Sequence, residues 1–222
     1  MYTPPPFKSD RAASLAFAQA RGFGTVCAWD GEKPVASSLP FCLSFSDDGT
    51  PIAASHVARG NALARLADGK SRWLLAVNGA DAYVSADWYV SPDQVPTWLY
   101  QSVHLSGTVE LMPDGELGAH LDALSAKFES WLAAKPPWTV AKVSAGRQEM
   151  LKKAIVGLVM TVEEIEGSFK LNQHKSDADY TAIANALGAQ AHADAREIAQ
   201  LMQDVRPEAF ASETNMLERS AP

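Results

Sequence analysis

Cysteine is scarce in this sequence. Among its 222 residues only Cys27 and Cys42 occur, and each lies inside a short apolar stretch, TVCAW or FCLSF. The two do not form a CxxC pair, so neither a disulfide framework nor a cysteine-rich zinc site can organise the fold. We expect both to be small apolar side chains of a protein in a reducing compartment.

Long apolar runs are also missing. No stretch of about 18 apolar residues occurs, as a membrane-spanning helix would need, and the N-terminal stretch MYTPPPFKSDRAAS lacks the apolar core of a signal peptide. We therefore expect a cytoplasmic protein without contact with a membrane. An apolar fraction of 47%, with 14 Gly and 13 Pro, excludes a disordered or collagen-like chain.

A surplus of positive charge is absent. The chain has 19 Lys and Arg against 26 Asp and Glu, a net charge of −7. Proteins that bind nucleic acid mainly through its phosphates normally carry a basic surplus, at least locally. We therefore expect little direct DNA binding.

The common catalytic and metal-binding motifs do not occur. The sequence contains no GxGxxG after a strand, no GxxxxGK[ST], no HExxH and no GxSxG. Its five histidines never stand four residues apart, and no cluster of Cys and His suits zinc. The sequence alone therefore predicts neither a metal site nor a catalytic residue.

Turn signals and periodicity outline the first half of the chain. A helix is expected between the possible caps Ser9 or Asp10 and Gly22. Asp30-Gly31 and Asp48-Gly49 each predict the turn of a β-hairpin, and Asn78-Gly79 predicts a third turn between SRWLLAV and DAYVSADWY. Between the second and third turns, NALARLAD can form about two helical turns.

One long strand is predicted over residues 97–112, because its apolar residues alternate with polar and aromatic ones. The apolar set should face a core, and the other set should face a partner that is flat or has polar edges. The core set is Val103, Leu105, Val109 and Leu111; the partner set is Trp98, Tyr100, Ser102, His104 and Ser106.

The second half begins with a helical period. Apolar residues recur from Leu117 to Trp131, and Lys135-Pro136-Pro137 should stop that helix. A strand over 155–167 and two helices, 178–187 and 191–204, complete the chain. Together these elements predict an α+β protein, a small β-barrel with peripheral helices and a C-terminal helical pair. We divide it into a domain at 1–176 and a helical extension of the same domain at 177–222.

Four stretches have compositions that an ordinary hydrophobic core does not explain. They are SHVARGN at 55–61, YVSADWY at 83–89, VPTWLY at 95–100 and KLNQH at 170–174. With the MYTPPPF start, they make the chain, to about residue 203, resemble the PaiB-type FMN-binding negative transcriptional regulator family. The sequence departs from that family's pattern at Gly60, Ala86, Asp87, Leu99, Asn172, His174 and Lys175.

The resemblance implies the split β-barrel of flavin reductases and pyridoxamine-phosphate oxidases. It further implies a homodimer with FMN at or near the subunit interface. The candidate cofactor-binding residues are His56, Arg59, Asn61, Ser85, Trp88, Tyr89, Thr97, Trp98, Tyr100, His104, Lys170, Asn172 and Gln173.

The candidate residues also make chemical sense as an FMN site. Arg59, Asn61 and a helix start near residue 61 offer a guanidinium, an amide and backbone N–H groups to the phosphate, and Lys170 offers a second cation. Asn172 and Gln173 add amides. Rings come from Trp88, Tyr89, Trp98 and Tyr100, and further hydrogen bonds come from Ser85, Thr97 and His104.

Structural alternatives exist for several candidates. Trp88 and Trp98 would equally suit a barrel core or a dimer interface, and Tyr100 and His104 share a strand face that could meet another subunit. His56 could satisfy a backbone carbonyl instead of a ligand. Lys170 taken alone would be a surface lysine, and only its place in the family pattern favours the cofactor.

Two functions are compatible with this sequence. The first is an FMN-binding flavoprotein, with redox activity on a small substrate if it is an enzyme. The alternative is a transcriptional regulator, a repressor acting through residues 181–202, which have the outline of a helix-turn-helix. The second helix of that unit carries Asp194, Glu197 and Asp204 against only Arg196 and Arg206, which suits DNA phosphates poorly.

Overall fold

The computed structural model describes residues 1–132 and 134–211. The chain divides into two compact units, which we call the barrel unit (11–77 and 103–165) and the helical-pair unit (1–10, 78–102 and 166 onward). The division passes through three long strands, each of which belongs to both units. The predicted division into 1–176 and 177–222 stays a prediction, and residues 212–222 of that extension lie outside the described residues.

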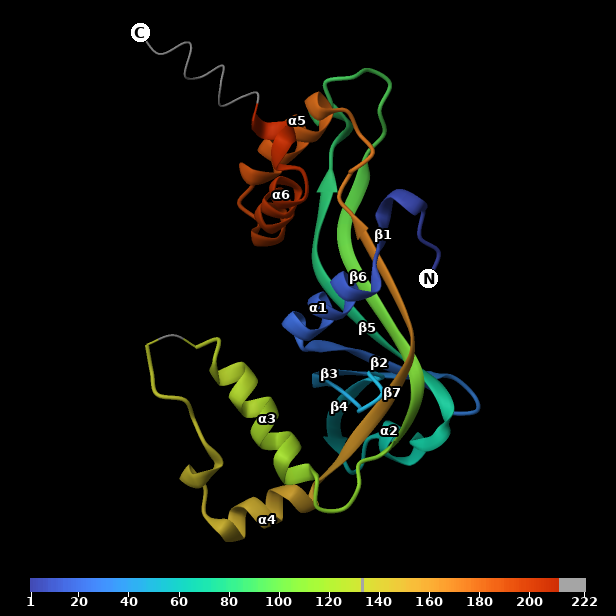
Figure 1. Cartoon of the computed structure of the whole chain (residues 1–222), viewed down its shortest axis with the longest axis vertical. Coiled ribbons are helices and arrows are strands. Elements are labelled where there is room, and N and C mark those ends of the chain that lie inside the picture. Colours follow the sequence, from blue (N-terminus) through green and yellow to red (C-terminus); the bar gives the residue numbers. More distant parts are fainter. Residues whose placement is uncertain (133, 212–222) are drawn as a thin grey trace. The chain divides into compact units, whose positions relative to one another are not determined.

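Six antiparallel strands form a closed barrel (Figure 1). The strands pair in the order β7-β4-β3-β2-β5-β6, and β6 pairs with β7 again, which closes the ring; the short strand β1 adds to β7 at Lys8↔Ser168. This confirms the α+β barrel that the sequence predicts. The strands are β1 Lys8–Ser9, β2 Phe23–Trp29, β3 Pro34–Phe45, β4 Pro51–Ala58, β5 Asp68–Val84, β6 Thr97–Leu111 and β7 Ile155–Lys170.

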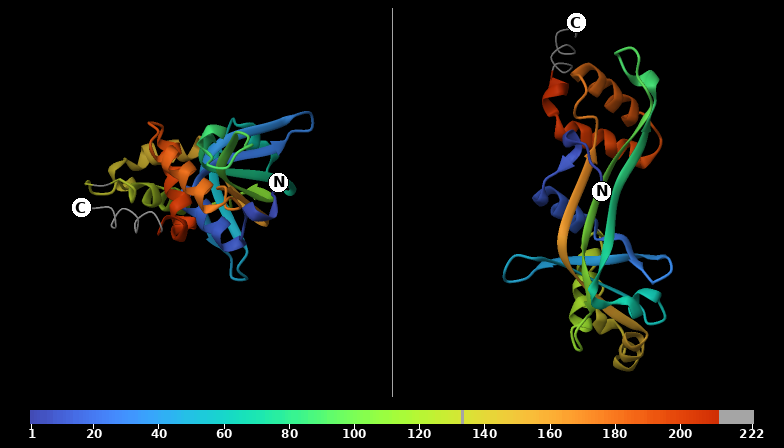
Figure 2. Two further views of the ribbon diagram at one scale, coloured as in Figure 1. Left: turned by 90° about the horizontal axis from the view of Figure 1, so that it is seen from above. Right: turned by 90° about the vertical axis from the view of Figure 1, so that its right-hand side faces the viewer.

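Both Asp-Gly hairpins are confirmed. In the first turn, Asp30 Oδ1 accepts hydrogen bonds from the backbone N–H groups of Glu32 and Lys33. In the second, Asp48 Oδ1 accepts from the backbone N–H of Thr50. Gly31 and Gly49 have φ of 103° and 82°, the left-handed region that glycine enters without steric cost. Both hairpins share the one strand β3, with a turn at each of its ends (Figure 2).

The predicted turn at Asn78-Gly79 is wrong, because β5 runs unbroken through it. Neither residue has the positive φ that a tight Asn-Gly hairpin turn requires. The Ser102 hydroxyl on β6 donates to Asn78 Oδ1 at 2.8 Å, so the asparagine is bonded to the neighbouring strand. Asn78-Gly79 instead marks a shift in alternation, as one extra residue in a strand causes. Buried positions change there from Trp73, Leu75 and Val77 to Ala80, Ala82 and Val84.

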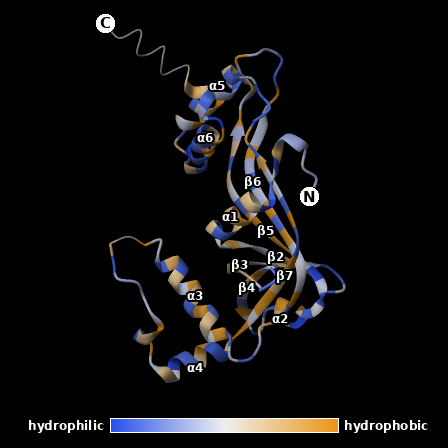
Figure 3. Ribbon diagram, viewed as in Figure 1, coloured by the Kyte–Doolittle hydropathy of each residue, from blue (hydrophilic) through white to orange (hydrophobic). Residues whose placement is uncertain are grey.

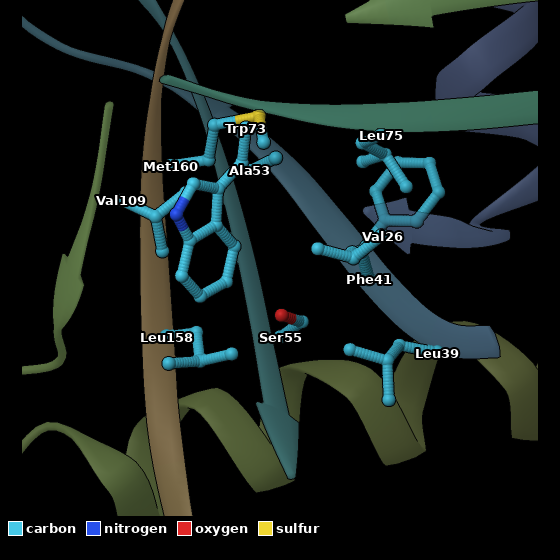
Figure 4. A pocket seen from close by; sticks show the side chains of 10 residues that line it. All are labelled: Val26, Leu39, Phe41, Ala53, Ser55, Trp73, Leu75, Val109, Leu158 and Met160. Carbon is cyan, nitrogen blue, oxygen red and sulfur yellow. The ribbon is translucent and has the colours of Figure 1, made fainter. Parts of the chain in front are cut away.

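The inside of the barrel is filled by side chains from alternate positions of its strands (Figure 4). The space left among them is only about 10 Å³, so no flavin can enter the barrel core. On β6 the predicted core residues Val103, Leu105 and Val109 are buried, whereas Leu111, at the end of the strand, is exposed. The lining side chains are those of Val26, Leu39, Phe41, Ala53, Ser55, Trp73, Leu75, Val109, Leu158 and Met160.

The described residues of the barrel unit form four α-helices: α1 Arg11–Arg21, α2 Ala62–Leu66, α3 Leu117–Glu129 and α4 Ala145–Lys153, with a 3₁₀ turn, η3, at Val140–Lys142. The predicted end of α1 is confirmed at Gly22, whose N–H donates a hydrogen bond to the Ala18 carbonyl. Figure 3 shows that apolar and polar residues are mixed along α3. It ends at Glu129, earlier than predicted, and the Glu129 carboxylate accepts a hydrogen bond from the backbone N–H of Trp138. Trp131 lies beyond the end of the helix and is exposed.

The predicted C-terminal helical pair is confirmed as α5 Asp177–Gly188 and α6 Ala193–Val205, which lie side by side (Figure 1). Ser176 caps α5 by accepting from the Asp179 N–H, and Tyr180 Oη donates to the Met202 carbonyl at 2.8 Å. The pair packs on Ala80, Ala82, Val84 and Leu99, so these strand ends and the helices share one core. Short 3₁₀ turns in the unit are η1 Pro5–Phe7, η2 Ala86–Trp88 and η4 Pro207–Phe210.

Cys27 on β2 and Cys42 on β3 are both free thiols, half-buried rather than fully buried. Burial raises the pKa of the Cys42 thiol, which keeps it protonated and unreactive at neutral pH. No helix within residues 1–132 and 134–211 is long and apolar enough to span a membrane.

Candidate functional site

A lysine and a hydroxyl meet where β6 begins and β7 ends. Lys170 Nζ donates to Thr97 Oγ1 at 2.7 Å, and Lys170 is half-buried. In the described part of the chain this ammonium has no carboxylate within ion-pair distance. A half-buried cation with only a neutral partner keeps its attraction for an anion.

The turn that follows β7 holds two more candidates. Asn172 is almost fully buried in the left-handed region, with φ of 60°, and its Nδ2 donates to Tyr89 Oη at 3.5 Å. The side-chain amide of Gln173 bonds the backbone of the same turn: its oxygen accepts from the Leu171 N–H, and its nitrogen donates to the Phe169 carbonyl. Asn172 therefore ties the turn to an aromatic ring, while Gln173 holds the shape of the turn.

Lys175 is a second cation at this turn, and the sequence analysis did not select it. Its Nζ donates to Gln94 Oε1 at 2.7 Å and lies 4.8 Å from the centroid of the Tyr89 ring. The pKa of His174 is lowered by burial first, then by the positive charges of Lys175 and Lys170. The potential at this turn is therefore positive.

Aromatic candidates line an open groove of about 630 Å³ in the same unit. Tyr83 and Trp98, on β5 and β6, meet edge to face with ring centroids 6.0 Å apart, and Trp88 at the end of η2 also lines the groove. Ser85 caps η2 by accepting from the Asp87 N–H at 3.2 Å. Tyr100 is half-buried on β6.

In the barrel unit, Arg59 and Asn61 already bind other parts of the protein. The Arg59 guanidinium donates to the carbonyls of Lys153 and Ile155, at 2.9 and 3.1 Å. Asn61 caps the five-residue helix α2 by accepting from the Leu63 N–H, and its Nδ2 donates to the Ser37 hydroxyl. The predicted open amide beside a helix start is thus occupied by the cap.

His56 has a partner that sequence reasoning missed. Its Nδ1 lies 3.2 Å from Nε2 of His120, on α3. Burial lowers the pKa of both imidazoles, that of His120 to about 4, with the His56 charge as a second cause. Their 64-residue separation leaves no local signal for the pair.

In the part of the chain that the structure describes, no three His, Cys, Asp or Glu side chains are grouped as a metal site would need. The remaining candidate, His104, is half-buried on β6.

The thirteen candidates divide between the two units. Four belong to the barrel unit: His56, Arg59, Asn61 and His104. Direct contacts within the helical-pair unit join Lys170 to Thr97 and Asn172 to Tyr89. Sequence reasoning missed Tyr83 and Lys175, although Tyr83 opens the YVSADWY motif and Lys175 directly follows KLNQH. The nine candidates of the helical-pair unit are Ser85, Trp88, Tyr89, Thr97, Trp98, Tyr100, Lys170, Asn172 and Gln173.

This fold is the split β-barrel of flavin-binding proteins. The chain superimposes on the FAD and heme binding protein from Mycobacterium smegmatis with a TM-score of 0.52, at 20% identity over 73% of each chain. It superimposes on the flavocytochrome Anf3 from Azotobacter vinelandii with a TM-score of 0.50, at 18% identity over 72% of this chain and 67% of that one. At these identities the likeness establishes the fold alone.

The family is established by sequence. Residues 1–164 match the family model described as "Putative FMN-binding domain", and the chain belongs to this family. It is also 34% identical, over 92% of its own length and 97% of the relative's, to the protease synthase and sporulation protein PAI 2 of Bacillus subtilis (strain 168). The PaiB-type resemblance is thereby confirmed, and the chain is an FMN-binding flavoprotein.

Proposed function

We propose that Lys170 and Thr97 hold the FMN phosphate and that the bound flavin serves a redox reaction on a small substrate. The observation that carries this proposal is the half-buried Lys170 ammonium, whose only described partner is the neutral Thr97 hydroxyl, at 2.7 Å. A phosphate would supply the missing negative charge and accept from both groups.

The helical-pair unit has the chemistry that FMN requires. Lys175 adds a second positive charge, and after burial the charges of Lys175 and Lys170 are the next causes that lower the pKa of His174. Tyr89 and Tyr100 would offer their rings to the flavin, and Ser85 and Asn172 would offer polar groups to the ring edge. The residues present therefore fit the cofactor.

When bound, FMN supplies hydride and electron transfer. The chain's own contribution in this proposal is to bind the phosphate through cations and to hold the ring between aromatic side chains. We assign no acid or base to the protein. His56, Arg59, Asn61, His104 and Gln173 stay predicted cofactor ligands, and Arg59 would need to bind phosphate in addition to its two carbonyls.

The experiment compares FMN with riboflavin, which lacks the phosphate. Lys170→Met should weaken FMN binding about ten- to a hundredfold and leave riboflavin binding nearly unchanged, because a hydrogen bond to a charged group contributes roughly 1.5–3 kcal/mol. Lys70→Met, at an exposed lysine of β5, is the control for loss of one charge. Arg59→Ala tests the second predicted cation in the same way. Equal losses for both flavins would remove Lys170 from the phosphate.

We further propose a cytoplasmic homodimer. Two free thiols suit a reducing compartment, and the half-buried aromatic side chain of Tyr100 on β6 suits a subunit interface. Size-exclusion chromatography with light scattering should give about twice the 23.8 kDa chain mass. A single-chain mass at micromolar concentration would contradict the dimer.

The regulator alternative, a repressor acting through the helical pair, has weaker support. Arg196 donates to the carbonyls of Gln190 and Ala191, and Arg206 is bonded to Asp177 and to the Lys175 carbonyl. Both arginines of the pair are thus engaged within the protein instead of standing open to DNA phosphates. We therefore expect the protein to bind DNA weakly.

A further inference from the structure

The aromatic groove lies beside a strand edge that has no partner on one side. β2 pairs with β5 only at Leu74–Ala76, so among the described strands β5 has β6 as its sole neighbour from Asn78 to Val84. Along this stretch, Asp81 and Tyr83 are exposed and alternate with the buried alanines of the helical-pair core. The groove is closed on its other side by the turn between α5 and α6, through Leu187, Gln190, Ala191, His192 and Ala195.

The ring surfaces of this groove are open. Tyr83 is 50% exposed and Trp98 is 54% exposed, although large aromatic residues are usually well buried. The Tyr83 hydroxyl and the indole N–H groups of Trp88 and Trp98 make no hydrogen bond to another residue among 1–132 and 134–211. Exposed aromatic faces bind planar rings by stacking and bind cations through the ring quadrupole.

Asp81 supplies the charge of the groove. Its carboxylate is exposed and makes no hydrogen bond or ion pair with any described residue. Arg196 of α6 donates to the carbonyls of Gln190 and Ala191, two residues of the groove, at 3.1 and 2.9 Å, and it forms no ion pair with Asp81. An unpaired carboxylate beside open aromatic rings is complementary to an organic cation and repels an anion.

We propose that this groove binds planar organic cations, of which an N-alkylated heteroaromatic ring is the simplest. The flat face of the ligand would contact the rings of Tyr83 and Trp98, and its positive charge would pair with the Asp81 carboxylate. The ligand is separate from FMN, whose phosphate is drawn to the positive turn at 170–175. The inference rests on the proposed function in one respect, namely that the bound flavin leaves the groove accessible.

The test is calorimetric titration of the FMN-loaded protein with 1-methylquinolinium chloride and, separately, with quinoline at pH 8. The two probes are nearly the same size, but only the first carries a permanent charge. The cation should bind severalfold more tightly than quinoline. Asp81→Asn should weaken cation binding about two- to fivefold and leave quinoline unaffected, as loss of an exposed charge pair predicts. Asp93→Asn, an equal charge change at an exposed loop residue outside the groove, should change neither.

Trp98→Leu should weaken binding of the cation about two- to fivefold. Trp98→Phe should lose less affinity than Trp98→Leu, since the phenyl ring retains a quadrupole. Equal affinity for the two probes, or an unchanged ratio in Asp81→Asn, would overturn the proposal. Release of FMN by the cation, seen in the flavin absorbance, would also overturn it, because the groove would then be the flavin's own ring site. If the protein retains no FMN, the proposed function fails, and the same titration of the flavin-free protein still decides the cation site.

Discussion

Nδ1 of His56 lies 3.2 Å from Nε2 of His120, and the two imidazoles meet edge to face with centroids 5.4 Å apart. The pair joins α3 to β4 of the barrel. One ring must donate and the other must accept, so the contact requires at least one neutral imidazole. Burial favours the neutral form in both, since it lowers both pKa values.

This pair predicts a loss of stability in mild acid. The pKa of a histidine in an unfolded chain is about 6.5, and that of His120 in the folded protein is about 4. Below pH 6.5 the unfolded chain therefore binds more protons than the folded one, and stability falls as pH drops towards 4. We expect a loss of about 1–2 kcal/mol between pH 7 and pH 5, less than the full shift allows because both rings are only partly desolvated. Urea unfolding at the two pH values measures it.

The matched variants for this effect are His120→Gln and His192→Gln. The first removes one titrating group of the pair and should flatten the decline with pH. The second changes an exposed histidine elsewhere and should leave the decline as in the parent protein. The same slope in the parent protein and in His120→Gln would show that the pair does not cause it.

Closure of the barrel depends on Gly107. A Cβ atom placed there would lie 1.8 Å from the Thr161 carbonyl oxygen, a backbone atom of β7 that cannot move aside. Gly107→Ala should cost about 3 kcal/mol or more, or prevent folding, because β6 and β7 would be forced apart. Thermal unfolding followed by circular dichroism measures the loss.

The control for that substitution is Gly146→Ala in α4. A Cβ at Gly146 meets no atom within 4 Å, and alanine favours a helix more than glycine does. This variant should gain up to about 1 kcal/mol. A similar change in both variants would contradict the steric account of Gly107.

Asp179 anchors the loop that follows η2. Its carboxylate accepts from the N–H groups of Val90 and Ser91 and from the Ser91 hydroxyl, at 2.8, 2.9 and 2.6 Å, and only 3% of the residue is exposed. The hydrogen bonds from Ser91 lower the pKa of this carboxyl. Asp179→Ala should cost about 2–3 kcal/mol, because two backbone N–H groups and a hydroxyl lose their charged acceptor, and should speed proteolysis of the loop at 90–96.

Asp194→Ala is the comparison, since Asp194 likewise lies in the first turn of a helix, α6. It should change stability by less than about 0.5 kcal/mol and leave the loop resistant to protease. Equal sensitivity of the two variants to protease would mean that Asp179 does not hold the loop.

DNA binding separates the flavoprotein from the regulator. With a net charge of −7 and with both arginines of the helical pair engaged, the protein should bind duplex DNA weakly and with little sequence preference at physiological salt. Fluorescence anisotropy at controlled salt measures this. Specific DNA-binding proteins reach roughly 10⁻⁸ to 10⁻¹¹ M. An affinity in that range, abolished by Gln203→Glu on the exposed face of α6, would make the regulator the better assignment.

Elements whose conformation is local could be predicted from the sequence. Asp30 and Asp48 bind backbone N–H groups two or three residues ahead, so each Asp-Gly turn forms with little help from the rest of the chain. The apolar periods of β6 and of the helical pair likewise record which face is buried. The motifs at 55–61, 83–89, 95–100 and 170–174 sufficed for the family and for FMN.

Features that depend on residues distant in sequence could not be predicted in this way. Asn78-Gly79 has the composition of a hairpin turn, yet its conformation follows from the bond to Ser102 and from two cores that bury opposite parities of β5. Asn61 caps a helix and binds Ser37 instead of standing open to a phosphate, and His56 finds His120 only through packing of α3 on β4. Such contacts join residues 24 to 64 positions apart. No local pattern encodes them, because each contact contributes to the free energy of folding only when distant segments are brought together.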